Sequence, residues 1–543
     1  MSLSRPWVKH YPEGVRPNLD YPDKTLQEYL WDTTEKYPGL KATVFLGQEM
    51  TFKELGEKIK RFANGLAGLG IKKGDRVAVM LPNCPEFVIS YYAILSLGGI
   101  VVQTNPMYVE RELQFQLQDS GAETIILLDV LYSRARAVKD QTSLKNIIVV
   151  SLPVAGTYTG EFGQEVIKFN DLLNQSEPTL PAVEVSPDDI AVLQYTGGTT
   201  GTSKGAMLTH KNLAANVYQV REFFSTTFFD GQERILTALP LFHVYGMTCC
   251  MNLAACFGGT MILVPKFDPT LVLEQIQRYR PTSFPGAPTM YVALLNHPNL
   301  KNYDVKSITS CVSGSAPLPV EVQTKFEEVT GAVVVEGYGL SEASPVTHCN
   351  PIRGMRKKGS IGVPYSDTLA RIVDIETGED LPPGQIGELV VKGPQVMKGY
   401  WNRPEETAKT LKDGWLYTGD MAKMDEDGFF YIVDRKKDMI IAGGYNIYPR
   451  DVEEVLYQHP KVKEAIVVGV PDAYRGETVK AYIVVKEGET LTEQEVIDFC
   501  NAHLARYKVP RLVEFRSELP KTAVGKVLRR QLREEELKKQ NKN

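Results

Sequence analysis

Two stretches of the chain follow the same order of patterns. Residues 74–103 read GDRVAVMLPNCPEFVISYYAILSLGGIVVQ, and residues 232–264 read QERILTALPLFHVYGMTCCMNLAACFGGTMILV. Each contains a strand-like run, Leu-Pro, an apolar helical stretch, Gly-Gly and a second strand-like run. This order is typical of a buried strand–helix–strand unit. We therefore predict an α/β fold with two related αβ subdomains, at about residues 50–185 and 186–330, and with ligands near the carboxyl ends of mostly parallel strands.

The rest of the chain indicates two further parts. A segment rich in short strands and turns runs from GSIGVP at residue 359 to about residue 434, which predicts a β-rich subdomain. The residues that follow alternate helix and strand patterns and predict a small α+β domain. At 543 residues the chain is too long for a single core. We expect a large N-terminal domain of residues 1–433, a connection at residues 434–437 and a C-terminal domain of residues 438–543.

Composition and charge restrict the class of partner. The 61 basic and 66 acidic residues are spread along the chain, so the sequence shows no footprint for nucleic acid, and we expect small-molecule partners. The seven cysteines include no CxxC pair and the N-terminus has no apolar signal region, which predicts a cytoplasmic protein with reduced cysteines. Residues 235–265 carry no charge, but Pro240 and the pair Gly258-Gly259 interrupt them, so we interpret them as strand, helix and strand rather than a membrane span.

The stretch YTGGTTGTSKG at residues 195–205 predicts a phosphate-binding loop. Its glycines let a ligand approach the backbone amides, and its hydroxyls and the Lys204 ammonium suit an anion with several acceptor oxygens. A flexible Ser/Gly linker is the alternative, but the strand-like run before the loop and the amphipathic stretch after it argue against a linker. The loop lacks the G-x-x-x-x-G-K-[ST] spacing of the P-loop, because Lys204 follows Ser203. We therefore expect a different phosphate chemistry.

Six motifs, in order along the chain, resemble one superfamily. They are YTGGTTGTSKGAMLTH, LPLFHVYG, GYGLSE, GWLYTGD, DRKKDMIIAGGYNIYPRDVE and PKTAVGKVLRR. They span nearly the whole chain and closely resemble the core motifs of the acyl-adenylate-forming superfamily, which contains acyl-CoA synthetases, adenylation domains and firefly-type luciferases. The opening stretch at residues 5–30, RPWVKHYPEGVRPNLDYPDKTLQEYL, is similar to the start of bacterial long-chain fatty-acid CoA ligases.

The resemblance implies a two-step reaction that uses ATP, Mg²⁺ and CoA. A carboxylate attacks the α-phosphate of ATP, which releases pyrophosphate and forms an acyl-adenylate, and the CoA thiol then displaces AMP. Glu342 matches a carboxylate that helps to hold Mg²⁺, and Lys526 matches a lysine that stabilises the charge on the α-phosphate. His243 matches a histidine that borders the acyl site. Ser341 stands where the family usually has threonine, and it keeps the hydroxyl group.

The same motifs imply residues that contact the nucleotide and the thiol. The residues implied for ATP binding are Thr196, Gly197, Gly198, Thr199, Thr200, Gly201, Thr202, Ser203, Lys204, Gly314, Ser315, Ala316, Pro317, Gly337, Tyr338, Gly339, Ser341, Asp420 and Arg435. Asp420 and Arg435 match the ribose contacts of the family, and Tyr338 matches the aromatic residue on adenine. Lys437 matches a hinge about which the C-terminal domain rotates between the two steps. Gly443, Gly444 and Tyr445 match the loop that admits the thiol.

The acid that is activated is expected to be apolar. The resemblance places the acyl pocket beside LPLFHVYGM, with Phe242, Tyr245 and Met247 in its lining. In the amino-acid-activating members that the chain resembles, an aspartate near this stretch holds the ammonium group. Residues 235–265 hold no acidic side chain, so the resemblance implies that the substrate is not a free α-amino acid. The leading hypothesis is a medium- to long-chain fatty-acid:CoA ligase, and the alternatives are an aryl-acid CoA ligase and a ligase that loads acyl-carrier protein. An adenylate-binding sensor without activity is disfavoured by Lys526 and Glu342. Chain length, contact with a membrane surface and oligomeric state, monomer or homodimer, stay open.

Overall fold

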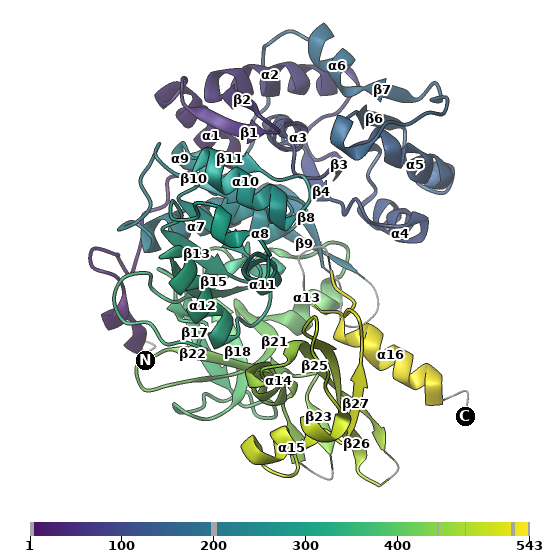
Figure 1. Ribbon diagram of the computed structural model, residues 1–543. Helices are drawn as coiled ribbons and strands as arrows, with labels where there is room; N and C mark the ends of the chain where they lie inside the picture. The colour runs from purple at the N-terminus through teal and green to yellow at the C-terminus, as the bar shows by residue number, and fades with distance from the viewer. Residues whose placement is uncertain (1–4, 197–202, 443–444, 473, 523–526, 541–543) are drawn as a thin grey trace.

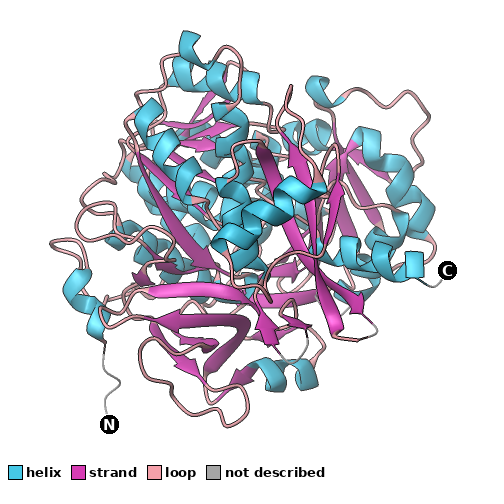
Figure 2. Ribbon diagram, turned by 60° about the horizontal axis from the view of Figure 1, so that its bottom comes forward, coloured by secondary structure: helices cyan, strands magenta, loops and turns pink. Residues whose placement is uncertain are grey.

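The computed structural model describes residues 5–196, 203–442, 445–472, 474–522 and 527–540. The N-terminal two thirds form two large sheets covered by helices, and the C-terminal part lies at the bottom in Figure 1. Figure 2 shows helices packed around the strands of these sheets. The mixed α/β architecture agrees with the fold class that the sequence predicts. No helix in the described ranges is long and apolar enough to cross a membrane.

The first sheet has eight strands, of which β8, β4, β3, β5, β6 and β7 are parallel. In spatial order the strands are β19 (Gly399–Tyr400), β9 (Lys204–Thr209), β8 (Ile190–Thr196), β4 (Ile100–Gln103), β3 (Arg76–Met80), β5 (Thr124–Leu128), β6 (Asn146–Val150) and β7 (Val166–Lys168). The helices of this region are α2 (Phe52–Gly68), α3 (Pro85–Ser96), α4 (Glu110–Ser120), α5 (Tyr132–Lys139) and α6 (Phe169–Gln175).

The second sheet has nine strands, and its central six are parallel. In spatial order they are β16 (Val363–Pro364), β15 (Val346–Cys349), β14 (Val333–Gly339), β13 (Ser310–Ser313), β12 (Ser283–Gly286), β10 (Arg234–Thr237), β11 (Thr260–Leu263), β1 (Lys41–Phe45) and β2 (Gln48–Thr51). Its helices are α1 (Leu26–Lys36), α7 (His210–Phe223), α8 (Val244–Gly246), α9 (Leu253–Phe257), α10 (Pro269–Tyr279), α11 (Pro288–Leu295) and α12 (Val320–Thr330), with a π-helical segment η4 (Met247–Asn252) between α8 and α9.

The two repeated sequence stretches form equivalent strand–helix–strand units, as predicted. Strand β3 pairs with β4 in parallel, and β10 pairs with β11 in parallel. The connecting helices are apolar on all sides and buried, as such helices are when they lie in a core. They pack on each other, and the Tyr92 hydroxyl donates to Asn252 Oδ1 at 3.0 Å. The uncharged residues 235–265 therefore form core rather than a membrane span.

The predicted boundary between the two subdomains, at residue 186, is wrong. Strands β8 and β9, assigned by the sequence to the second subdomain, extend the first sheet beside β4. Strands β1 and β2 extend the second sheet beside β11, although they precede the first sheet in the chain. The sheet that each of these strands joins depends on pairing with strands that are distant in sequence. The residue pattern within a strand does not show which strand it pairs with.

The remaining strands form two smaller sheets. The β-rich part contains β17 (Leu369–Val373), β18 (Gly387–Lys392), β20 (Leu411–Lys412), β21 (Trp415–Met424) and β22 (Phe430–Arg435), with α13 (Pro404–Thr410) beside it. The C-terminal sheet contains β23 (Ile440–Ala442), β24 (Tyr445–Ile447), β25 (Val462–Asp472), β26 (Gly476–Val485) and β27 (Leu512–Phe515). Helices α14 (Pro449–Gln458), α15 (Glu493–His503) and α16 (Arg529–Gln540) accompany it, and its apolar clusters are separate from the N-terminal core.

Candidate active site

One large cavity, with a volume of 990 Å³, gathers most of the described residues that the sequence predicts for the site. It opens at the carboxyl ends of β8, β13 and β14, where ligands of parallel sheets usually bind. Residues from the C-terminal part, including Lys521, Thr522 and Leu528, complete its wall. The predicted residues in the lining are Thr196, Lys204, Phe242, His243, Tyr245, Gly314, Ser315, Gly337, Tyr338, Gly339, Ser341, Glu342, Asp420, Arg435 and Lys437.

Several predicted residues lie outside this lining or outside the described ranges. Ser203 is described, and its hydroxyl donates to the Thr196 carbonyl oxygen at 2.5 Å, across the ends of the glycine-rich loop. Ala316 and Pro317 follow Ser315 but do not line the cavity. The residues Gly197, Gly198, Thr199, Thr200, Gly201, Thr202, Gly443, Gly444 and Lys526 lie outside the described ranges, and of Tyr445 only the backbone is described.

One wall of the cavity carries a hydrogen-bonded acid. Asp420 on β21 pairs in register with Arg435 on β22, which brings the Arg435 Nε to 3.4 Å from Asp420 Oδ1. The hydroxyl of Tyr338, at the end of β14, donates to the other carboxylate oxygen of Asp420. Burial and the neighbouring carboxylate raise the pKa of Tyr338 far above its ordinary value, so this phenol is a permanent donor. The three side chains form a rigid polar group at the cavity wall.

A second polar group surrounds the start of β9. The Lys204 ammonium forms an ion pair with Glu406 on α13 and lies 5.3 Å from the centre of the Tyr400 ring. The Tyr400 hydroxyl donates to Glu342 Oε1 at 2.7 Å. Lys204 and Glu342 therefore both contact Tyr400, and a cation and a carboxylate both line the cavity.

The donor set suits Mg²⁺ carried by a ligand rather than held by protein alone. Glu342 lines the cavity and has an oxygen that Tyr400 does not occupy. Within the described ranges no three His, Cys, Asp or Glu side chains gather as a metal site. Mg²⁺ is commonly bound by one or two carboxylates together with substrate phosphates. The residues present fit that mode, in which Glu342 would be the protein ligand.

Glycine is required where the backbone approaches the cavity most closely. A Cβ atom at Gly314 would lie 2.9 Å from the Tyr245 ring, and one at Gly339 would lie 2.3 Å from the Pro345 carbonyl oxygen. Ser315 adopts a positive φ of 71°, which is uncommon for a residue with a side chain. The Tyr245 hydroxyl donates to the Val312 carbonyl at 2.8 Å and holds its ring against Gly314. These contacts leave no space for a side chain at Gly314 or Gly339.

The predicted acyl-site residues divide into two groups. Phe242, His243 and Tyr245 line the cavity. The His243 Nδ1 accepts the backbone N–H of Tyr245 at 3.3 Å, which caps α8 and fixes the ring. Met247 is buried but does not line the cavity, because it lies in the π-helical segment and its sulfur accepts from Gln103 Nε2.

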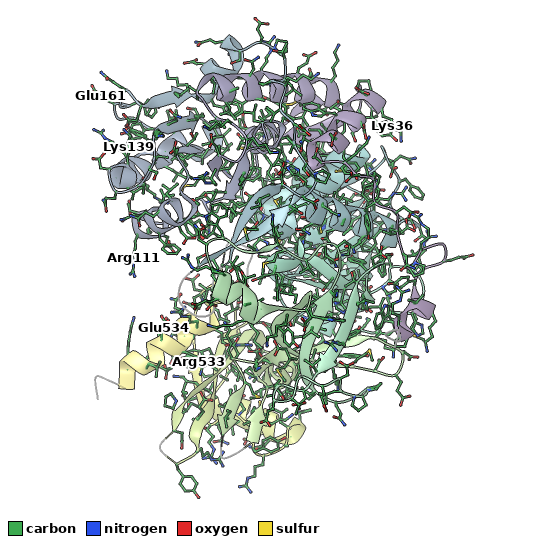
Figure 3. All side chains as sticks on the ribbon, turned by 180° about the vertical axis from the view of Figure 1, so that it is seen from behind. Lys36, Arg111, Lys139, Glu161, Arg533 and Glu534 are labelled. Carbon is green, nitrogen blue, oxygen red and sulfur yellow. The ribbon has the colours of Figure 1, made fainter. Side chains whose placement is uncertain are left out.

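The connection between the N-terminal and C-terminal sheets lies beside the cavity. Strand β22 ends at Arg435 and β23 begins at Ile440, and Lys437 between them lines the cavity. Burial lowers the pKa of the Lys437 ammonium to about 8. Arg533 on α16, labelled in Figure 3, donates to the Lys437 carbonyl oxygen at 3.2 Å and pairs with Glu477 at 3.0 Å. Helix α16 therefore contacts the backbone of the connection directly.

Sequence reasoning missed several residues of the cavity wall. Glu388 on β18 accepts the backbone N–H of Gly419 at 3.0 Å and pairs with Lys436 at 3.3 Å, next to Asp420. Tyr400 lies on β19, a two-residue strand whose position depends on pairing with β9. Neither residue belongs to a motif, and only the pairing of distant strands brings them to the site.

The comparison with known proteins decides the family. A profile described as AMP-binding enzyme matches residues 30–401, and one described as AMP-binding enzyme C-terminal domain matches residues 451–526. The chain belongs to the AMP-binding enzyme family. This AMP-binding enzyme is 52% identical over 561 residues to the long-chain-fatty-acid–CoA ligase of Bacillus subtilis, with 99% of each chain covered. It is 40% identical over 490 residues to the feruloyl-CoA synthase of an Amycolatopsis species, with 90% of this chain and 94% of the relative covered.

The fold of this AMP-binding enzyme is also found in solved structures. The ATP-bound crystal structure of MatB from Rhodopseudomonas palustris matches it with a TM-score of 0.86 and 32% identity, and covers 94% of this chain and 99% of the MatB chain. The match includes the small C-terminal α+β domain, because nearly the full length of both chains is covered.

Proposed function

We propose that this AMP-binding enzyme activates a fatty acid with ATP and transfers the acyl group to CoA. The observation that carries the proposal is that one cavity is lined both by the polar side chains of Lys204, Glu342 and Asp420 and, beyond Tyr245, by apolar side chains that form an apolar extension. The polar part of the lining can bind ATP together with the carboxylate of the acid. The apolar extension can bind the alkyl chain of the acid. The 52% identity with the long-chain-fatty-acid–CoA ligase of Bacillus subtilis supports the same activity.

In the first step, a carboxylate oxygen of the fatty acid bonds to the α-phosphorus of ATP, and the bond to the bridging oxygen breaks with release of pyrophosphate. The substrate carboxylate is already ionised at neutral pH, so no base is required. We assign Asp420 and Arg435 to the ribose, and Tyr338 to the adenine. Lys204 and Lys526 are assigned to the phosphates, where their charges stabilise the transition state.

When bound together with ATP, Mg²⁺ would neutralise charge on the phosphates. Glu342 is the protein carboxylate that would hold it. The hydrogen bond from Tyr400 keeps Glu342 Oε1 in place, and the second carboxylate oxygen would be the one that binds the metal ion. Ser341 supplies a hydroxyl at the adjacent position.

In the second step, the CoA sulfur bonds to the acyl carbonyl carbon, the carbon–oxygen bond to AMP breaks, and the thiol proton is lost to solvent. We assign the passage for the thiol to the loop that contains Gly443, Gly444 and Tyr445. The C-terminal domain, residues 438–543, is proposed to rotate about residues 434–437 between the steps. The contact between α16 and the Lys437 carbonyl would have to change in that rotation.

The test is pyrophosphate release with ATP and Mg²⁺ across butyrate, octanoate, dodecanoate, palmitate, ferulate, benzoate and a set of amino acids, each with and without CoA. We expect the highest kcat/KM with dodecanoate or palmitate and sustained turnover only with CoA. Release of pyrophosphate with none of the fatty acids would contradict the proposal.

A second candidate is an aryl-acid CoA ligase. The observation that favours this candidate is the 40% identity with a feruloyl-CoA synthase, over 90% of this chain. The same panel separates the two, because an aryl-acid ligase would prefer ferulate or benzoate to palmitate. A ligase that loads acyl-carrier protein is distinguished by offering CoA and carrier protein together and identifying the acylated product.

A further inference from the structure

The apolar extension of the cavity follows one face of the second sheet. Ser283 and Pro285 on β12 line it, and so do Ser310 and Val312 on the neighbouring strand β13. Ser283 pairs with Ser310 and Pro285 with Val312 in the parallel register. Alternate residues of a strand point to the same face, so the extension runs along the strands from their carboxyl ends to their amino ends. The distance from Gly314 to Ser310 is about 13 Å at ~3.3 Å per residue.

The opposite wall of this extension is a helical face. It is lined by Val220, Phe224, Thr227 and Phe228. These residues belong to α7 and the turn after it, and their spacing of three or four residues places them on one side of the helix. Leu253 on α9 adds a further apolar side chain. An extended alkyl chain lying along the strands would therefore contact the sheet on one side and apolar side chains on the other.

The extension ends at a buried acid. Glu233 precedes β10, is 6% exposed and lines the cavity at the end away from Tyr245. The Thr282 hydroxyl donates to Glu233 Oε2 at 2.6 Å, and the Phe229 backbone N–H donates to Oε1 at 3.1 Å. Burial raises the pKa of the Glu233 carboxyl above its ordinary value. Two hydrogen bonds thus hold a polar group at the end of an apolar channel.

A second hollow lies behind this acid. It has a volume of 630 Å³ and is lined by residues of the strand ends, including Lys41, Arg234 and Thr309. Glu233 and Thr227 line both this hollow and the large cavity. They therefore form the partition between the channel and a space that could receive a longer chain.

We propose that Glu233, held by Thr282, is the floor of the acyl channel and sets the longest acyl chain that the enzyme uses efficiently. This inference rests on the proposed fatty-acid ligase activity. Each buried methylene adds about fourfold to affinity, which corresponds to about 0.8 kcal/mol. A chain that reaches the floor gains nothing from further methylenes, because its end must displace a carboxyl group from two hydrogen bonds or bend back in the channel.

Two variants test the floor in opposite directions. Glu233→Ala joins the channel to the second hollow, and we expect the kcat/KM ratio of arachidate to palmitate to rise at least tenfold. Ser310→Leu fills the channel in front of the floor, and we expect the ratio of palmitate to octanoate to fall at least tenfold. Glu233→Gln keeps the size of the side chain, so its ratios should stay close to those of the unmodified enzyme.

A matched control removes another buried acid. Asp129 is 2% exposed and accepts the Ser151 hydroxyl at 2.6 Å, but it does not line the cavity. Asp129→Ala should leave both ratios unchanged, although it loses a comparable hydrogen bond. A change in the ratios with Asp129→Ala would show that any loss of a buried acid alters the profile, and would overturn the assignment.

The unmodified enzyme is measured first, so that the two proposals fail separately. Absence of turnover with every fatty acid contradicts the proposed function. Turnover with fatty acids, together with unchanged ratios in both Glu233→Ala and Ser310→Leu, overturns the floor alone. If Glu233→Ala does not fold, the ratio in Ser310→Leu decides, and displacement of a bound fluorescent fatty acid by octanoate, palmitate and arachidate gives a second measurement that needs no catalysis.

Discussion

At the scale of the residue, Asp420 contacts two different partners on the cavity wall, a hydroxyl group and a guanidinium group. It accepts the Tyr338 hydroxyl and faces Arg435, so both oxygens are oriented before any ligand enters. We expect Asp420→Ala to raise the KM for ATP by about 10- to 100-fold, the cost of one or two hydrogen bonds to a charged group. The KM for the fatty acid should change little.

The measurement is steady-state kinetics with ATP and fatty acid varied in turn. Asp413→Asn is the control, because Asp413 is an exposed residue of the turn that precedes β21, the strand that carries Asp420, and asparagine tolerates its positive φ of 52°. Unchanged ATP kinetics in Asp420→Ala would remove Asp420 from the nucleotide site.

Two buried histidines predict that the folded state loses stability as the pH is lowered. Burial lowers the pKa of His210 to about 4 and that of His348 to about 3. In the unfolded chain both titrate near pH 6.5, so between pH 6.5 and 4 the unfolded state binds protons that the folded state does not. Stability therefore falls as the pH is lowered through this window, by about 2 kcal/mol per histidine at pH 5.

The check compares thermal midpoints at pH 7 and pH 5. His210→Gln should show a smaller drop between the two pH values than the unmodified protein, because one of the proton-binding sites is gone. His503→Gln, at an exposed position of α15, should show the same drop as the unmodified protein. Equal drops in all three proteins would contradict the role of His210.

At the scale of the element, strand β14 and helix α14 meet through a buried acid and base. Glu336 on β14 lies 3.9 Å from the Arg450 guanidinium, and burial raises the pKa of this carboxyl to about 7. Arg450 also donates to the Ile432 carbonyl at 2.8 Å. Removing one partner of a buried pair leaves an uncompensated charge, so we expect Arg450→Met to destabilise the protein by about 3 kcal/mol.

Glu336→Gln in the Arg450→Met background should restore part of that loss, because the amide requires no cation. Chemical unfolding of the single and double variants gives the coupling energy. Arg530→Met, which breaks an exposed pair with Glu534 on α16, is the control and should cost at most about 0.5 kcal/mol. Additive effects of the two changes would show that the pair does not link the elements.

Most elements of the fold could be predicted from the sequence, and the pairing at sheet edges could not. The βαβ pattern predicts β3–α3–β4 and β10–α9–β11, because period and glycine positions are local. The placement of β1 depends on pairing with β11, and that of β8 depends on pairing with β4. No local sequence pattern predicts either pairing. The same limit applies to the site: motif residues such as Asp420 were predicted, whereas Tyr400 and Glu233 arrive through pairing and packing of distant segments.

At the scale of the whole molecule, the proposed rotation separates two half-reactions. Lys526→Ala should reduce acyl-adenylate formation by about 100-fold or more, as loss of one charge-stabilising contact does elsewhere. It should spare thioester formation from supplied acyl-adenylate. Lys437→Pro should spare acyl-adenylate formation and reduce thioester formation from supplied acyl-adenylate. Proline fixes φ at the connection and removes a backbone N–H, which would hinder the rotation.

The two half-reactions are measured separately, as pyrophosphate release in a single turnover and as CoA consumption with synthetic acyl-adenylate. Lys436→Pro is unsuitable as a control because it lies in the same connection, so Lys423→Ala on β21 serves instead. Equal losses of both steps in Lys526→Ala, or full activity of Lys437→Pro in both, would refute the assignments.

The exchange of edge strands between the two large sheets has a consequence for synthesis of the chain. The Phe45 end of β1 leaves the ribosome about 215 residues before Thr260, where its partner β11 begins. At ~5–20 residues per second this interval lasts about 10–40 s. During that time the β1–β2 hairpin presents one unpaired apolar edge, so the nascent chain must be protected or slow to aggregate until the second half has been translated.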